Sequence, residues 1–329
     1  MPELRLLDAI RQAMYEEMKR DERVVVLGED VGPKGGVFGA TDGFWAEFGE
    51  ARVLDTPLAE STIVGAAIGM AANGLIPIAE IQFSDFIFPA TNQIVSEAAR
   101  MRYRSNGAFG CPIVIRAPYG GGVEVHGGLY HSQSIEAFFA HVPGLKVVAP
   151  SVPYDAKGLL KAAIRDPDPV LYLEHKRLYR AVRGEVPEDD YVVPIGPAVV
   201  RRPGTTLSLF AYGQMLHEAL AVAAEMAGEG IDVEVVDLQT LRPLDVETIL
   251  ASVRKTNKAL IVYEDNRFLG FGAEVAAIIA EEAFDALDGP VMRVAGLDVP
   301  AVPYADPLAA AFMPSRAKIA DAVRRLATY

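Results

Sequence analysis

Short β-branched runs alternate with longer segments of helical periodicity along almost the whole of this sequence. In the longer segments apolar residues recur every three or four positions, as at Leu7, Ile10, Met14 and Met18. Strands that alternate with helices favour a parallel sheet covered by helices. The strands predicted for the first half are Val24–Gly28, Ile76–Ile81, Pro112–Ala117, Leu145–Ala149 and Val170–Glu174.

The alternation stops after residue 180, where four prolines interrupt a polar, partly acidic stretch, and it resumes after residue 205. The strands and helices predicted beyond that point are Thr206–Ala211, Gln214–Gly228, Asp232–Val236, Asp245–Thr256, Lys258–Tyr263, Gly272–Ala286 and a last helix near Ser315–Leu326. We therefore predict an α/β protein with two Rossmann-like parallel-sheet domains, at residues 1–180 and 206–329, joined by a linker at 181–205.

Charge and composition exclude several classes of protein. The longest apolar stretch, Ile63–Ala72, is far shorter than the ~20 residues that span a bilayer. The charged amphipathic start lacks the features of a secretory signal, so we expect a cytoplasmic protein. A net charge of −13 argues against nucleic acid and anionic membranes, and favours a basic protein partner. With Cys111 alone and five scattered histidines, no internal disulfide or zinc-ligand spacing is present.

Common catalytic motifs are also missing from the sequence. It contains no phosphate loop of the GxxxxGK[ST] type, no GxSxG nucleophile elbow and no HExxH. In "FLGFGAEVAA", Gly270 and Gly272 resemble a dinucleotide loop, but Val275 stands where the third glycine would be. We therefore favour an ordinary helix start at this point over a nicotinamide site.

Glu60 stands out in "DTPLAESTIVGAAIGMAANG", because it directly precedes a run of small and apolar residues. One interpretation is structural, since an acid in the first turn of a helix interacts favourably with the helix dipole, and Pro57 suits a helix start. The other is functional, because Gly65 and Gly69 allow close approach by a subunit or a cofactor. A partly desolvated carboxyl group at that rim could exchange a proton with a ligand.

A second candidate segment is "APYGGGVEVHGGLYHSQSIEAFFAH", in which five glycines between positions 120 and 128 predict a flexible loop. It delivers His126 and His131 after a parallel strand, where α/β proteins place ligands. His131 could equally be a surface or capping histidine, and His126 stays undecided. We interpret His141 as structural.

Aromatic residues gather in "EIQFSDFIFPATNQIVSEAARMRYRS". We expect Phe83 and Phe88 to pack in the core, whereas Phe86 could face a flat ligand ring.

Taken in this order, the motifs resemble the beta subunit of the thiamine-diphosphate-dependent decarboxylase component of 2-oxo acid dehydrogenase complexes. The match covers essentially the whole chain. The residues that carry it are "VLGEDVGPKGGVF", "DTPLAESTIVGAAIGMAANGL", "EIQFSDFIFPATNQIVSEAARMRYRS", "GLYHSQSIEAFFAHVPGLKVV", "PYDAKGLLKAAIRDPDPV" and "EHKRLYR". The resemblance implies a pyrimidine-binding domain in the first half and a transketolase C-terminal-like domain in the second.

The resemblance also implies roles for individual residues. Glu60 would contact the aminopyrimidine ring of thiamine diphosphate and activate the cofactor by sharing a proton with it. Leu58 and Gln82 would line the aminopyrimidine pocket, and Glu29 is a further cofactor-binding candidate. Phe86 stands where the family has tyrosine, so it keeps a stacking face but loses a hydroxyl group.

By the same resemblance, His131 would assist transfer of the acyl group to a lipoyl group, as a proton donor. The motif that binds magnesium and the diphosphate is absent here and belongs to the family's alpha subunit. The chain would therefore be inactive alone and would form a heterotetramer of two alpha and two beta subunits, which docks on a lipoyl-bearing acyltransferase core.

Some relatives bind a structural potassium ion through backbone oxygens, and oxygen ligands suit such a hard cation. The positions that match are Ile113, Val114, Ala163, Asp166 and Asp168.

Three rival functions remain at this stage: the beta half of an acetoin dehydrogenase or split transketolase-type enzyme, a non-catalytic scaffold subunit, and a nicotinamide-dependent oxidoreductase. Among 2-oxo acids, the stretches "EIQF", "RYRS" and "LYHSQSIEAFF" resemble the branched-chain members of the family more, and they favour branched-chain substrates narrowly over pyruvate.

Overall fold

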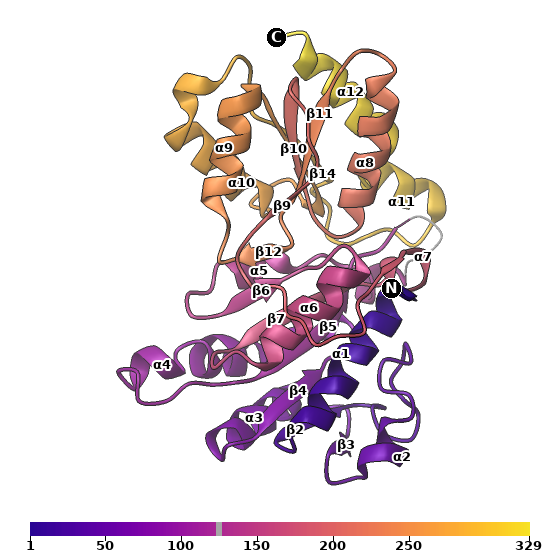
Figure 1. The fold of residues 1–329 in the computed structure, drawn as a ribbon, viewed down its shortest axis with the longest axis vertical. Coiled ribbons are helices and arrows are strands. Elements are labelled where there is room, and N and C mark those ends of the chain that lie inside the picture. The colour runs from indigo at the N-terminus through magenta and orange to yellow at the C-terminus, as the bar shows by residue number, and fades with distance from the viewer. Residues whose placement is uncertain (123–126) are drawn as a thin grey trace. The chain divides into compact units, whose positions relative to one another are not determined.

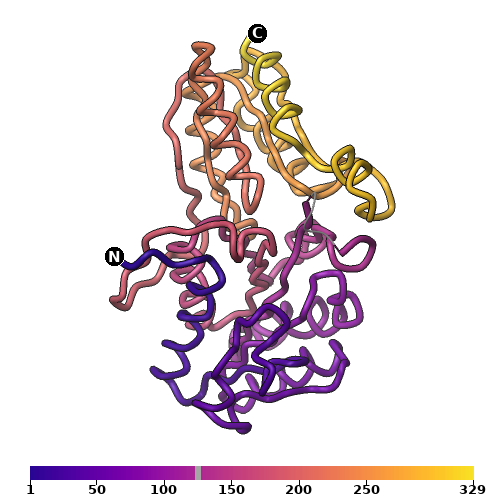
Figure 2. Tube along the Cα trace, turned by 90° about the vertical axis from the view of Figure 1, so that its right-hand side faces the viewer, coloured from indigo at the N-terminus to yellow at the C-terminus, as the bar shows by residue number. Residues whose placement is uncertain are grey.

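The computed structural model describes residues 1–122 and 127–329. The chain divides into two compact units, which can be followed by element in Figure 1 and by residue number in Figure 2. The first unit comprises Met1–Tyr119 and Phe138–Ile195, and the second comprises Gly120–Ala137 and Gly196–Tyr329. Each unit is built around a mainly parallel sheet with helices, so the predicted fold class is confirmed. The predicted domain limits stay predictions.

In the main sheet of the first unit the strands lie in the order β6-β7-β5-β4-β2-β3, and these six strands are parallel. Their bounds are β2 Val24–Gly28, β3 Val53–Asp55, β4 Ile76–Glu80, β5 Val114–Tyr119, β6 Lys146–Val148 and β7 Val170–His175. Strands β2, β5 and β7 are buried along their whole length, as expected of a parallel sheet covered on both faces. The carboxyl ends of β3, β2 and β4 therefore meet at one edge of the sheet.

The first unit contains helices, single turns and one π-helix. Their bounds are α1 Leu6–Arg20, α2 Phe44–Phe48, α3 Glu60–Ala72, the turns Ser84–Phe86 and Phe88–Ala90, the π-helix Gln93–Ala98, α4 Met101–Arg104, α6 Pro153–Ile164 and α7 Leu178–Ala181. Helix α5, Glu136–Ala140, begins at the end of the Gly120–Ala137 segment.

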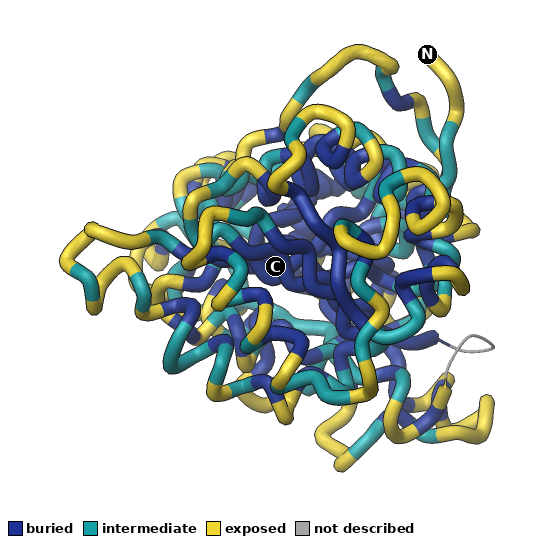
Figure 3. Tube along the Cα trace, turned by 90° about the horizontal axis from the view of Figure 1, so that it is seen from below, coloured by how far each residue is buried: buried dark blue, intermediate teal, exposed yellow. Residues whose placement is uncertain are grey.

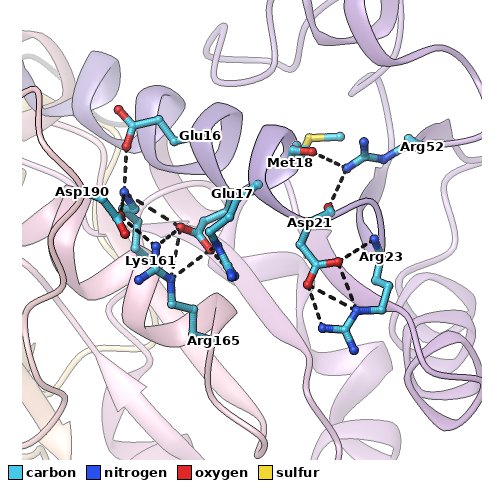
Figure 4. A network of polar contacts seen from close by, with 10 residues as sticks. Glu16, Glu17, Met18, Asp21, Arg23, Arg52, Lys161, Arg165 and Asp190 are labelled. Carbon is cyan, nitrogen blue, oxygen red and sulfur yellow. Dashed lines mark hydrogen bonds and ion pairs between the residues drawn. The ribbon is translucent and has the colours of Figure 1, made fainter.

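Helices α1 and α6 are joined by buried ion pairs (Figure 4). The Nζ atoms of Lys157 and Lys161 each lie 2.8 Å from a carboxylate oxygen of Glu16, although both lysine side chains are almost completely buried. Arg165 lies 2.6 Å from Glu17, whose side chain is also buried. Buried charges persist only when they are paired, so these contacts fix how α1 lies against α6.

A second buried ion cluster lies within the sheet of the first unit. Arg116 on β5 contacts Glu80 on β4 at 2.5 Å and Glu174 on β7 at 2.6 Å. The Tyr179 hydroxyl donates to Glu174 at 2.5 Å. Burial raises the pKa of Glu80 against the opposing effect of the guanidinium group of Arg116. The cluster links three neighbouring strands close to their carboxyl ends.

The strands of the second unit lie in the order β14-β13-β10-β11-β9. Their bounds are β9 Val199–Arg202, β10 Leu207–Ala211, β11 Val233–Asp237, β13 Ala259–Asn266 and β14 Met292–Gly296. The short strand β12, Thr240–Arg242, follows β11. Strands β10, β11, β13 and β14 are parallel, and β9 is an antiparallel edge strand.

Two of the helices of the second unit, α9 and α12, begin at a capping side chain. Their bounds are α8 Gln214–Ala227, α9 Val246–Thr256, α10 Gly272–Glu282, the turn Phe284–Ala286, α11 Asp306–Phe312 and α12 Arg316–Ala327. The Asp245 side chain accepts the Thr248 backbone N–H at the start of α9, and Ser315 accepts that of Lys318 at the start of α12.

The stretch predicted as a linker contains regular structure. Strand β8, Arg183–Glu185, pairs with β1, Glu3–Arg5, in an antiparallel two-stranded sheet, and β9 joins the second sheet.

Figure 3 shows buried residues along the inner segments and exposed residues on the outer turns and at the N-terminus. No helix among the described residues is both long enough and apolar enough to cross a membrane.

Candidate functional site

Glu60 is the first residue of α3, which begins after the four residues that follow β3. The Thr56 backbone N–H donates to the Gly28 carbonyl oxygen at 2.9 Å and thereby fixes this connection beside the end of β2. No side chain caps the helix start at Ala59, so the Glu60 carboxylate is the acidic group that meets the helix dipole. The residue is half-buried.

Glu29 and Gln82 lie at the same edge of the sheet, because each follows a strand that neighbours the others. Burial raises the pKa of Glu29, and the nearby charges of Asp30 and Glu60 raise it further. The Gln82 side-chain amide donates to the Glu29 carbonyl oxygen at 3.4 Å and to the Asp30 carboxylate at 3.5 Å. The structure therefore brings together Glu29, Glu60 and Gln82, which the sequence predicted separately.

Two further groups stand out in the connection before α3. The Thr56 hydroxyl oxygen is buried and has no hydrogen-bond partner within residues 1–122 and 127–329. Leu58 leaves 68% of its surface exposed. An unused buried hydroxyl, an exposed apolar side chain and two neighbouring carboxyl groups together suit a flat ligand with donor and acceptor atoms on its edge. Thr56 was not predicted as a site residue.

Phe86 is half-buried and belongs to a chain of aromatic contacts. Its ring lies 5.6 Å from that of Phe83, which lies 5.5 Å from Phe38, and Phe38 lies 5.2 Å from Tyr179. The prediction that Phe88 packs in the core is wrong, because Phe88 is 42% exposed and pairs with the exposed ring of Phe138.

His131 lies in the second unit, after a single turn at Gly128–Tyr130. The Gly127 backbone N–H donates to the Ser132 hydroxyl at 2.9 Å, and a side chain at Gly127 would collide with His131. At Gly128, where φ is +65°, a side chain would collide with Tyr304. These two glycines are therefore required for close packing around His131. His126 lies outside the described residues.

A cluster of carboxyl groups lies next to the segment that carries His131, and it was not predicted from the sequence. Glu136 is fully buried and Glu264 is 5% exposed, and Asp265 neighbours both. The Tyr212 hydroxyl donates to Glu136 at 2.6 Å. Burial first, and then the charge of Asp265, raise the pKa of Glu136 to about 8. The only local signal was an acid placed among apolar residues in "SIEAFF".

A small pocket adjoins this carboxyl cluster within the second unit. Its lining residues come from the His131 segment, from the end of β13 and from an apolar cluster, and they are Ser132, Gln133, Ser134, Glu264, Asp265, Asn266, Val302, Phe312 and Met313.

Some atoms of the residues predicted to bind potassium have partners in the structure. The Ile113 carbonyl oxygen accepts the Val170 N–H at 3.0 Å, and that of Ala163 accepts the Asp166 N–H at 3.3 Å. Lys146 pairs with the Asp166 carboxylate at 2.5 Å, and Arg102 pairs with Asp168 at 2.6 Å. Val114 is buried in β5. Among the described residues, no group of three or more His, Cys, Asp and Glu side chains could hold a metal ion.

Gly270 and Gly272 are explained by packing. A side chain at either position would collide with the Tyr263 ring on β13, and α10 begins at Gly272. The glycines are needed to bring this helix start close to its strand, as the preferred interpretation of the sequence expected.

Two family descriptions match the chain. Residues 3–182 match the pyrimidine binding domain of transketolase, and residues 196–319 match the transketolase C-terminal domain.

Curated relatives match along nearly the full length. The chain is 58% identical over 323 residues to the 2-oxoisovalerate dehydrogenase subunit beta of Bacillus subtilis (strain 168), covering 98% of each chain. It is 51% identical over 298 residues to the pyruvate dehydrogenase E1 component subunit beta of the same organism, covering 91% of each. The corresponding subunit of Acholeplasma laidlawii is 50% identical over 322 residues, 98% of this chain and 97% of that one.

Among solved structures, a split-gene transketolase, described as an inactive beta4 tetramer, has the same fold with a TM-score of 0.80. It is 24% identical and the match covers 99% of this chain and 98% of the other.

Proposed function

Because this chain belongs to the family of 2-oxo acid dehydrogenase beta subunits, we propose that it acts with an alpha subunit in the thiamine-diphosphate-dependent oxidative decarboxylation of a 2-oxo acid. The acyl group that remains is passed to a lipoyl group. The observation that carries the proposal is the identity of 58% along 98% of a 2-oxoisovalerate dehydrogenase subunit. A branched-chain 2-oxo acid is accordingly the preferred substrate. Pyruvate is the second candidate, because the next relative is 51% identical.

The edge of the first sheet fits the aminopyrimidine ring of thiamine diphosphate. The ring carries both donor and acceptor atoms, and the edge offers the carboxyl groups of Glu60 and Glu29 and the unused hydroxyl of Thr56. Leu58 and the half-buried ring of Phe86 supply apolar surface for a flat ligand. Gln82 holds the Glu29 connection in place through its side-chain amide. In Phe86 the stacking face is kept without a hydroxyl group.

Glu60 would hold and share a proton with the ligand at its carboxylate oxygens. Beside it, burial and the charges of Asp30 and Glu60 raise the pKa of Glu29, which favours a proton on Glu29. The chemistry that thiamine diphosphate supplies when bound is nucleophilic attack on the 2-oxo carbon and storage of the electron pair that decarboxylation releases. Glu60 is thus a proposed catalytic residue as well as a cofactor ligand.

His131 would serve the second half of the reaction as a proton donor to the lipoyl group during acyl transfer. Its support is the close packing of Gly127 and Gly128, which fixes the backbone on which the imidazole is carried.

The partners follow from the incomplete site. Magnesium and the diphosphate would be held by the alpha subunit, since this sequence lacks that motif, in a heterotetramer of two alpha and two beta subunits located in the cytoplasm. The assembly would dock on a lipoyl-bearing acyltransferase core. The net charge of −13 suits a basic docking module, whose binding should then weaken as salt rises.

A structural potassium ion is a weaker part of the proposal. Its ligands would be oxygens of Ile113, Val114, Ala163, Asp166 and Asp168. A higher melting temperature in potassium than in sodium at equal ionic strength is expected, and equal melting temperatures would count against the site.

The substrate is tested with the chain co-expressed with its alpha subunit. Release of carbon dioxide is measured with 3-methyl-2-oxobutanoate and with pyruvate, and cleavage is measured with acetoin, each with and without thiamine diphosphate. We expect cofactor-dependent turnover that is fastest with 3-methyl-2-oxobutanoate. Fastest turnover with acetoin would establish the acetoin alternative, and no turnover with any substrate would favour a scaffold subunit.

A further inference from the structure

Glu136 anchors the end of the segment that carries His131. It is the first residue of α5, five positions after His131, and its side chain is fully buried. The Tyr212 hydroxyl, which follows β10, donates to Oε1 at 2.6 Å. Oε2 is buried and has no hydrogen-bond partner among the residues that the structure describes. A buried oxygen of this kind is costly when it is charged and much less costly when the carboxyl group is protonated.

The groups around Glu136 oppose a negative charge on it. Asp265 and Glu264 both approach from the end of β13, and the electrostatic effect of each raises the pKa of Glu136. Burial raises the pKa of Asp265 itself to about 6. The Tyr212 hydroxyl and a hydrogen bond from the Glu136 backbone favour the charged form. Three carboxyl groups and one phenol thus share a largely buried space.

The same cluster holds the other end of the segment. The Gly121 backbone N–H donates to Glu264 at 3.3 Å, and the Gly120 N–H donates to the Gln133 carbonyl oxygen at 3.0 Å. Gly121 is therefore tied to β13 and Glu136 to Tyr212, on either side of the described residues that carry His131.

We propose that Glu136 is a positioning residue for His131: its neutral carboxyl group holds the His131–Ser134 segment on the second unit, and loss of its proton loosens the segment. This inference rests on the role proposed above for His131. Glu136 does not need to touch substrate or cofactor in order to act in this way.

The sign of the pH dependence follows from linkage. When the segment opens, Glu136 enters water and its pKa returns to the ordinary value of 4.5. Between that value and about 8, the closed segment binds a proton that the open segment releases. The equilibrium constant for opening should therefore rise about tenfold per pH unit in this range and level off above it.

Hydrogen exchange of the full chain tests this without cofactor or substrate. Exchange of peptides covering residues 127–135 is measured at about pH 6.5, 7.5 and 8.5 and corrected for the intrinsic chemical rate. In the wild type we expect opening to increase about tenfold over the first step and to level off by the last. In Glu136→Gln, which keeps the shape and the acceptor for Tyr212, opening should change less than about twofold.

Three further variants sharpen the test. Asp265→Asn removes the neighbouring charge and should move the levelling point to lower pH. Tyr212→Phe removes the hydrogen bond and should increase opening at every pH while the slope is kept. Glu281→Gln makes the same chemical change on the exposed face of α10 and should behave as the wild type.

A flat wild-type profile, or a Glu136→Gln profile with the wild-type slope, would overturn the inference. Neither result would bear on the proposal that the assembled protein decarboxylates a 2-oxo acid. Conversely, failure of the substrate test would remove the role of His131 but not the pH-dependent opening, so the two failures are distinguishable.

Discussion

Arg116 illustrates how strongly single residues are constrained in the first unit. Its guanidinium group lies between Glu80 and Glu174 and is completely buried. One cation faces two carboxyl groups, so the cluster depends on Arg116 for compensation, and the Tyr179 hydroxyl supports Glu174. Replacing Arg116 would leave two buried acids without their partner.

We predict that Arg116→Leu lowers the free energy of unfolding by about 3–5 kcal/mol, because it leaves the buried carboxyl groups of Glu80 and Glu174 without their cationic partner. Arg104→Leu is the matched control, since Arg104 pairs with Glu97 at the surface and should change stability by at most about 1 kcal/mol. Urea unfolding of both variants measures the difference. Equal effects would show that the buried cluster contributes no more than a surface pair.

The buried carboxyl group of Glu136 should make the free energy of unfolding fall as pH rises. Its pKa is raised to about 8 in the native state, so its contribution is fully present below the ordinary carboxyl pKa and is lost as pH rises to about 8. Relative to Glu136→Gln, the wild type should lose on the order of 1.4 kcal/mol per pH unit between pH 6 and 7. Urea unfolding at the two pH values checks this, and a constant difference between the proteins would contradict it.

Residues that belong to a recognised motif were named from the sequence, and residues that depend on distant burial were not. Glu29, Glu60 and Gln82 were each named from the family resemblance, and the structure adds that each follows a strand whose carboxyl end lies at one edge of the sheet. Glu136 was missed because its burial depends on β13, more than a hundred positions away.

At the level of elements, some helix glycines lie in close contact with a neighbouring element. Others face open space among the described residues. A side chain at Gly272, the first residue of α10, would meet the Tyr263 ring and Ile261. A side chain at Gly69, within α3, would meet nothing within 4 Å.

The two positions should respond to alanine with opposite signs. Gly272→Ala should destabilise the chain by about 1–3 kcal/mol through overpacking. Gly69→Ala should stabilise the isolated chain by about 0.5–1 kcal/mol, because alanine favours the helix and has open space. Thermal unfolding of the two variants distinguishes the cases, and stabilisation by Gly272→Ala would show that the close approach is not required.

Element prediction succeeded where burial and periodicity agreed. Strand β2 has the predicted bounds, since it is a short run of buried valines and leucine between polar turns. Strand β14 was missed because most of its residues are only half-buried and lack a clear pattern. The sequence pattern does not reveal that Gln93–Ala98 is a π-helix, in which each hydrogen bond spans one residue more than in an α-helix.

At the level of the whole molecule, we propose that this chain supplies one part of a catalytic site, and its sequence has no motif for the diphosphate. The exposed small residues Ala66 and Gly69 of α3 suit a contact with another subunit. The assembled protein, and not the isolated chain, is therefore the form proposed to be active.

The central claim is that Glu60 activates the bound cofactor. Its most direct test is a single-turnover measurement of carbon dioxide release by the assembled protein at saturating thiamine diphosphate, comparing wild type, Glu60→Gln and the exposed control Glu50→Gln. We predict that Glu60→Gln assembles normally but loses about 10²–10⁴-fold in rate, while Glu50→Gln retains wild-type activity. A rate within about twofold of wild type for Glu60→Gln would contradict the claim. A positioned proton-transfer group contributes about 10²-fold or more to a rate, so this carboxylate would then not act as one.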